Sequence, residues 1–183
     1  RTRRVPRLRA SFGAVALMKP SFTIILPTIG RPKFFRPALA SAAAQTYEPL
    51  HVLVSDNAAE PPVRDEEVEP WRSQRKVRLI RRPARIGAFS AHQHYRVCLE
   101  EAEGDYVFIL SDDDLISPGF VNAAMQCFEA DPEVRVVISR QVEIDEHFLD
   151  APADEPLTWQ ILPGREFLHR WLILHDSMGM LTA

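Results

Sequence analysis

Short apolar runs alternate with amphipathic stretches along this chain, and the alternation predicts its elements. Apolar, largely β-branched runs predict buried strands, and these lie at 22–26, 51–54, 77–80, 106–110 and 134–139. Stretches of helical periodicity or composition predict helices over 34–46, 87–103, 117–130 and 164–174. This order predicts an α/β fold with a mostly parallel sheet and helices on both of its faces.

Local signals refine the boundaries of these elements. Ser117 followed by Pro118 has the pattern of an N-cap and a first helical residue. The stretches 58–70 and 150–163 are rich in proline and predict loops. In the helix predicted from Gly87, five residues recur on one face and predict its buried side: Ala91, Tyr95, Cys98, Leu99 and Ala102.

Three of the predicted strands end in polar, turn-forming residues. These endings are residues 27–31, 55–57 and 111–114. In an open α/β sheet, ligands bind beyond the carboxyl ends of the strands, so a parallel arrangement would bring the three segments to one edge. The alternative is that these are ordinary polar loops.

The acidic triplet Asp112–Asp114 carries most of the chemical information. Neighbouring carboxylates a few ångströms apart repel by roughly 2–3 kcal/mol per pair at an effective dielectric constant of about 20. A hard cation such as Mg²⁺ or Mn²⁺ would remove this repulsion. The alternative is a solvated acidic turn that caps the next helix, although Ser117 already offers a cap there.

Other candidate binding groups stand at the same predicted edge. Asp56 could accept a hydrogen bond from a base or ribose, or could simply end its strand in an Asx turn. Thr28 and Arg31 could reach a nucleotide through a hydroxyl and a cation. Arg85, near the start of a predicted helix, is the best substrate contact among the many arginines of 72–96, most of which we expect on a solvated surface.

Composition and charge narrow the class of protein. The 183 residues suit one domain, and the net charge of −3 argues against a general nucleic-acid partner. No apolar run is long enough for a transmembrane segment, and the two cysteines lack metal or redox spacing, so we expect buried reduced thiols.

Residues 1–20 hold six basic groups and no acid, and the remainder holds 16 basic and 25 acidic groups. We therefore expect 1–19 to be a basic extension outside the domain 20–183; a transit peptide, a disordered tail and upstream sequence before Met18 are the alternatives.

Three segments in order resemble the family 2 glycosyltransferases. "FTIILPTIGR" (22–31) resembles their first strand and nucleotide loop, and "SAAAQTYEPLHVLVSDNA" (41–58) resembles their first helix and second strand. "RIGAFSAHQHYRVCLEEAEGDYVFILSDDDLISPGF" (85–120) resembles the turn, helix, strand and Asp-rich DXD element that follow. The resemblance covers residues 21–139.

The resemblance implies a GT-A (Rossmann-like) fold, an inverting transfer and a divalent cation, Mn²⁺ or Mg²⁺. The donor would be a nucleotide-diphosphate sugar, with a UDP-sugar favoured, and the acceptor a hydroxyl of a saccharide, a lipid-linked molecule or a protein. The matching nucleotide-sugar-binding positions are Pro27, Thr28, Arg31, Asp56, Arg85, Gly87 and Asp112. The matching metal ligands are Asp113 and Asp114, with the register inside the triplet open by one residue.

The family pattern is not followed throughout. The family has an asparagine near 92–94, where this chain has His92, Gln93 and His94. The general base of the family lies well after the metal motif, so we expect it beyond residue 183; Asp176 is a weak candidate within the chain. We therefore expect a C-terminally incomplete fold. The alternatives are a non-catalytic nucleotide-binding fragment and, more distantly, a nucleotidyltransferase, which should carry a richer Gly/Lys loop than 28–32. We expect a cytoplasmic location, with peripheral membrane association as an option.

Overall fold

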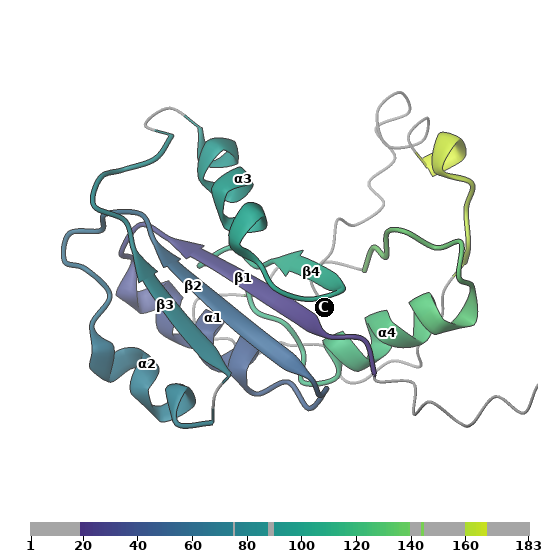
Figure 1. Cartoon of the computed structure of the whole chain (residues 1–183), viewed down its shortest axis with the longest axis horizontal. Coiled ribbons are helices and arrows are strands. Elements are labelled where there is room, and N and C mark those ends of the chain that lie inside the picture. Colours follow the sequence, from purple (N-terminus) through teal and green to yellow (C-terminus); the bar gives the residue numbers. More distant parts are fainter. Residues whose placement is uncertain (1–18, 75, 88–89, 140–143, 145–159, 168–183) are drawn as a thin grey trace, which may run out of the picture.

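A computed structural model describes residues 19–74, 76–87, 90–139, 144 and 160–167 of the chain. Within them, a four-stranded sheet has the order β3-β2-β1-β4, and every neighbouring pair is parallel (Figure 1). The strands are β1 (Phe22–Thr28), β2 (Leu50–Asp56), β3 (Val77–Arg81) and β4 (Tyr106–Ile109). The helices between and after them are α1 (Pro32–Ala43), α2 (Asp65–Arg72), α3 (Ala91–Glu101) and α4 (Phe120–Ala130). The predicted parallel α/β architecture is confirmed.

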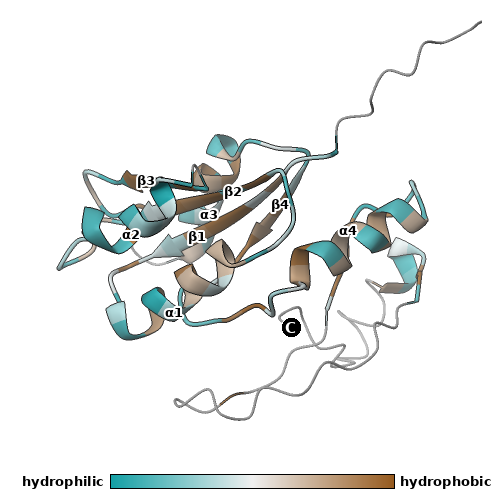
Figure 2. Cartoon of the chain, turned by 90° about the horizontal axis from the view of Figure 1, so that it is seen from below, coloured by the Kyte–Doolittle hydropathy of each residue, from teal (hydrophilic) through white to brown (hydrophobic). Residues whose placement is uncertain are grey.

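The two faces of the sheet are covered differently. Alternate side chains of β1, beginning with Phe22 and Ile24, join a core with the buried faces of α1, α2 and α4. Rings from β4 extend this core, since Phe108 lies 4.8 Å from Phe120 of α4 between ring centroids. The other face carries α3, as Figure 1 shows. Figure 2 shows the apolar colour concentrated in the strands, whereas α2 is mostly hydrophilic.

Three predictions of local structure are wrong. The predicted loop 58–70 contains most of α2, because acids in its first turn interact favourably with a helix N-terminus. The predicted cap Ser117 is not the cap: the N-cap of α4 is Gly119, and the Ser117 carbonyl accepts from the Phe120 amide in the preceding turn. The predicted strand 134–139 forms no strand in the structure.

The predicted buried face of α3 is also wrong in part. Cys98 is buried as expected, but Leu99 is 43 % exposed, and His94 is the other buried residue of the helix. Both cysteines are free thiols on helices, although Cys127 is only half-buried. The helix predicted at 164–174 is described for residues 164–167, and its remainder lies outside the described residues, as do 1–18 of the predicted basic extension.

Candidate active site

The carboxyl edge of the sheet brings the predicted polar segments together. Thr28 at the end of β1 is the register partner of Asp56 at the end of β2. On the other side of β1, the Leu110 amide donates to the carbonyl of Ile25. This bond keeps the chain after β4 beside β1, so the acidic triplet that follows lies next to the end of β1. The expectation that three strand ends converge is therefore confirmed.

One hydrogen-bonded group joins the first and third of these segments. Thr28 Oγ1 donates to Asp112 Oδ2 at 2.6 Å, and the Gly30 amide donates back to Thr28 Oγ1 at 3.1 Å. The Arg31 guanidinium spans two carboxylates: NH2 donates to Asp112, and NH1 donates to Asp113 Oδ2 at 2.9 Å. Residues more than 80 positions apart in the sequence thus form one polar cluster at the sheet edge.

The electrostatics of the triplet differ from residue to residue. Asp112 is only 4 % exposed and gives both carboxylate oxygens to Thr28 and Arg31. Hydrogen bonding to Asp112, followed by that to Asp113, raises the pKa of Arg31 despite its partial burial. Burial, reinforced by the charge of Asp113, raises the pKa of Asp114 above its ordinary value. Arg31 therefore neutralises two of the three acids, and Asp114 keeps the least compensated charge.

Both carboxylate oxygens of Asp56 accept hydrogen bonds from the loop that follows β2. Its Oδ1 and Oδ2 accept from the amides of Ala59 and Val63, each at 2.8 Å, and the residue is 1 % exposed. These bonds are those of a carboxylate that ends a strand and shapes the following loop, which is the structural alternative to a base contact. A contact of Asp56 with a nucleotide stays a prediction.

The remaining predicted contacts lie around the same edge. Pro27 is buried at the end of β1. Gly30 has φ +87°, and a Cβ there would lie 2.6 Å from the Cβ of Ala59, so the loops after β1 and β2 touch. Gly87 has φ +70°, and a Cβ would lie 2.2 Å from the Ser90 carbonyl oxygen. Arg85 is exposed and forms no ion pair with any residue that the structure describes. Asp176 lies outside the described residues.

Two amide side chains that the pattern analysis did not select hold these loops. Asn57 exchanges hydrogen bonds of 2.9 and 2.8 Å with the carbonyl and amide of Ile86. Gln45 is 1 % exposed; its amide group donates to the Ser117 carbonyl at 2.7 Å and accepts from the Val121 amide at 3.1 Å. Gln45 lies inside the helix predicted over 34–46, so no sequence signal set it apart. Both residues position loops, and these side-chain hydrogen bonds go to residues other than the predicted contacts.

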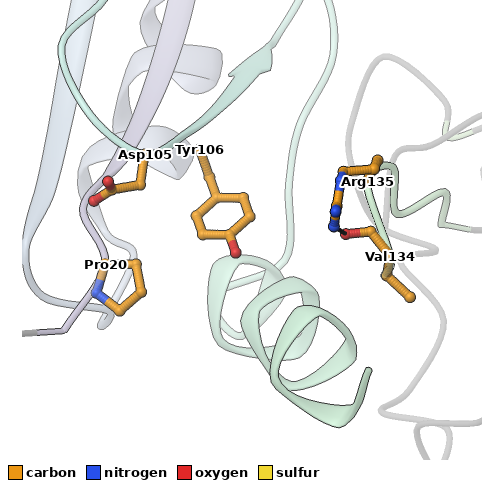
Figure 3. A pocket seen from close by; sticks show the side chains of 5 residues that line it. All are labelled: Pro20, Asp105, Tyr106, Val134 and Arg135. Atoms are coloured by element: carbon orange, nitrogen blue, oxygen red, sulfur yellow. Dashed lines mark hydrogen bonds between the residues drawn. The ribbon is translucent and has the colours of Figure 1, made fainter. Parts of the chain in front are cut away.

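The hollow in Figure 3 lies elsewhere. It has a volume of about 470 Å³ and is lined by Pro20, Asp105, Tyr106, Val134 and Arg135. Pro20 lies two residues before β1 and Asp105 directly precedes β4, so this hollow lies at the amino ends of the strands. It shares no residue with the polar cluster at the carboxyl ends, which is the edge where α/β folds bind ligands.

The triplet suits a cation that also takes ligands from its substrate. No group of three or more His, Cys, Asp or Glu side chains in the described part of the chain could enclose a metal ion. Mg²⁺ and its analogues commonly bind through one or two carboxylates, with phosphate oxygens and water completing the shell. Asp113, half-exposed with one oxygen paired to Arg31, and Asp114 fit such a partial ligand set.

Comparison with known proteins gives a consistent result. Residues 23–181 match the family model described as glycosyl transferase family 2. The chain is 32 % identical over 114 residues to the succinoglycan biosynthesis protein ExoW of Rhizobium meliloti (strain 1021), covering 60 % of this chain and 35 % of that protein.

Two solved structures share the fold. S. aureus TarS (residues 1–349, in complex with UDP) superposes with a TM-score of 0.52 at 23 % identity, over 60 % of this chain and 32 % of TarS. The mannosyltransferase PcManGT from Pyrobaculum calidifontis, in complex with GDP-Man and Mn²⁺, gives 0.51 at 25 % identity, over 64 % of this chain and 34 % of that protein. The chain thus spans about a third of the length of these relatives.

Proposed function

Because the chain belongs to glycosyl transferase family 2, we propose that residues 20–183 form the nucleotide-sugar-binding part of a glycosyltransferase. The reaction is transfer of a sugar from a nucleotide-diphosphate sugar to an acceptor hydroxyl with inversion. The observation that supports it best is the cluster of Thr28, Arg31, Asp112 and Asp113 at the carboxyl edge of the sheet.

The residues of this cluster divide between nucleotide and cation. In this proposal Thr28, Arg31 and Asp112, together with the neighbouring Pro27 and Asp56, hold the nucleoside and its phosphates; their shared position at the carboxyl edge of the sheet supports it. Arg85 and Gly87 lie in the stretch that Asn57 ties to the end of β2, within reach of the same edge. Arg85 is exposed and is free to turn towards a phosphate.

Asp113 and Asp114 are the residues that would hold Mn²⁺ or Mg²⁺. A cation bound there supplies charge neutralisation and Lewis acidity at the leaving diphosphate. Asp114 has an additional reason to take a cation, because its burial beside Asp113 makes its negative charge costly.

The donor and the location are parts of the same proposal. A UDP-sugar is the favoured donor; TarS was solved with UDP, but the GDP-Man of PcManGT makes GDP the necessary comparison.

No helix within the described residues is long and apolar enough to cross a membrane. We propose a cytoplasmic domain, and vesicle co-sedimentation would test for peripheral association with a membrane.

Calorimetry on the whole chain tests the binding proposal. We expect UDP or GDP to bind in the presence of Mn²⁺, and Asp113→Ala to weaken that binding at least tenfold. The matched control is Glu66→Ala, which removes an acid whose side chain is 81 % exposed and lies on α2. The proposal is wrong if neither nucleotide binds, or if Asp113→Ala binds like Glu66→Ala.

Release of free nucleotide from the donor separates an enzyme from a binding module. Little turnover by a chain that binds donor and metal would favour the non-catalytic alternative for these 183 residues. Turnover that is lost in Asp176→Asn would identify Asp176 as the base. Steady turnover that survives this change would require another base.

A further inference from the structure

A largely buried polar cluster lies between the sheet and α3, next to the end of β2 that carries Asp56. It joins Ser55 of β2, Arg82 just after β3, and His94 and Glu101 of α3. Ser55 Oγ lies 2.8 Å from His94 Nε2, and Arg82 Nε donates to Ser55 Oγ at 3.1 Å. Arg82 NH1 donates to Glu101 Oε1 at 2.7 Å. Ser55 is fully buried and His94 is 3 % exposed, so the bond between them forms away from water, whereas the Glu101 side chain is 32 % exposed.

The burial of this cluster favours a neutral imidazole. Arg82 Nε can only donate, so Ser55 Oγ is the acceptor of that bond. In the neutral tautomer that carries its proton on Nδ1, His94 Nε2 accepts the Ser55 hydroxyl proton, and proton uptake at Nε2 removes this acceptor. His94 also lies in the first turns of α3, where the helix dipole disfavours a positive charge.

The charged groups around His94 come from three elements. Arg82 faces it from the end of β3, Glu101 from the same helix, and Asp56 from the end of β2. Burial and then the charge of Arg82 lower the pKa of His94, and Glu101 and Asp56 offset this only in part. The uncharged thiol of Cys98 adds no positive charge, and burial raises its pKa.

The cluster is connected to the predicted donor contacts through the backbone. The Arg82 amide donates to the Asp56 carbonyl at 2.8 Å, so the residue that bonds Ser55 also fixes the end of β2. Four residues later, Ile86 exchanges two hydrogen bonds with Asn57. The stretch 82–87, which carries Arg85, is therefore held at both ends against the strand that carries Asp56.

We propose that His94 is a positioning residue: its neutral imidazole holds Ser55 and Arg82 so that the 82–87 stretch keeps the arrangement that binds the nucleotide donor, and proton uptake by His94 releases that stretch. The effect on donor binding rests on the proposed function. The effect on the 82–87 stretch does not, because it concerns the protein alone.

The direction of the pH effect follows from burial and charge. A protonated His94 would place a second cation, with little access to water, next to the Arg82 guanidinium, and its Nε2 could no longer accept from Ser55. If only the neutral form binds, the apparent Kd for nucleotide increases up to tenfold for each pH unit below the pKa of His94. At higher pH the affinity stays constant.

Two readouts on the full chain test this proposal. The first is the amide hydrogen-exchange protection of Arg82 and Ile86 in the free protein as the pH falls from 8 to 5. The second is the Kd for UDP or GDP with Mn²⁺ over the same range. The variant is His94→Gln, whose amide can still bond Ser55 but does not titrate. The control is His51→Gln, an exposed imidazole at the amino end of β2.

We expect wild type and His51→Gln to lose protection at both amides, and to lose nucleotide affinity, with one shared midpoint, while His94→Gln loses neither in that range. Ser55→Ala removes the link without a new charge and should weaken protection at Ile86 at every pH. Protection that falls identically in wild type and His94→Gln, or that stays unchanged in both, would overturn the proposal. Protection that responds as expected in a protein that binds no nucleotide would overturn the proposed function alone.

Discussion

Removing Arg31 gives the sharpest test of the polar cluster. Arg31→Met keeps an unbranched side chain on the first-strand loop but leaves Asp112, 4 % exposed, with Thr28 as its remaining side-chain partner. Breaking a fully buried ion pair by removing one partner costs about 3–5 kcal/mol. The Arg31 side chain is 40 % exposed, so solvent screens the pair and we expect a loss of about 1–2 kcal/mol in the free energy of unfolding at neutral pH.

The pH dependence of this loss identifies its cause. Asp114 has a raised pKa in the folded protein, so it favours folding below its unfolded pKa, and this contribution disappears as the pH rises through the folded pKa. Arg31 lowers that pKa, and its removal enlarges the penalty at neutral pH. We therefore expect Arg31→Met to lie closer to wild type at pH 4 than at pH 7.5, and Mn²⁺ to stabilise the variant more than the wild type.

Urea unfolding at both pH values, with and without Mn²⁺, measures these differences. The matched control is Arg96→Met, which removes an exposed arginine whose contact with Glu100 is 3.5 Å long. Such a pair contributes little, so the control should lose less than about 0.5 kcal/mol at either pH. The electrostatic account of the cluster fails if Arg31→Met is no less stable than Arg96→Met, or if its loss is independent of pH.

Two further substitutions probe the loops around the cluster. Gly30→Ala forces a Cβ at φ +87° to within 2.6 Å of the Cβ of Ala59 in the neighbouring loop. Thermal unfolding should therefore show a loss of about 1–3 kcal/mol in stability. The control Gly164→Ala has open space around the new methyl group and should change stability by less than about 1 kcal/mol. An equal effect of the two changes would contradict the close approach. Gln45→Leu removes the side-chain acceptor of the Val121 amide and one of the two donors to the Ser117 carbonyl, which keeps the Phe120 amide. The change should cost about 1–3 kcal/mol and weaken Mn²⁺ binding; a fully stable variant with unchanged metal affinity would show that Gln45 does not hold the segment after the triplet.

Four of the five predicted strands, and the convergence of three of their ends, could be predicted because both depend on local pattern. A parallel sheet buries near-continuous apolar runs, and β1 and β2 have that composition, so only the topology was needed to align Thr28 with Asp56. Helix α2 was missed because its proline and acidic residues, read along the sequence, are typical of a loop. Its first-turn acids become favourable only when a helix N-terminus stands behind them.

The connections inside the site could not be predicted from pattern. Arg31 is one arginine among many, and its bond to Asp113 spans 82 positions, so it depends on how two loops are turned towards each other. Apolar periodicity placed Leu99, and not His94, on the predicted buried face of α3, whereas His94 is 3 % exposed. Its burial is explained by partners on two other elements, Ser55 and Arg82, which no window of the helix sequence contains.

The carboxylates at this edge serve the fold and the proposed chemistry with the same atoms. Asp56 uses both oxygens to hold the amides of its own loop, and Asp112 uses both to hold Thr28 and Arg31. Buried carboxylates are stable only when their hydrogen bonds are satisfied, so these two are fixed in orientation before any ligand arrives. Asp113 and Asp114 lack such complete partners, and Asp114 carries its charge at a cost. These two fixed carboxylates stand beside Asp113, which shares Arg31, and Asp114, whose charge is the least compensated. We therefore expect a cation with its phosphate ligands to bind there without reorganising the strands.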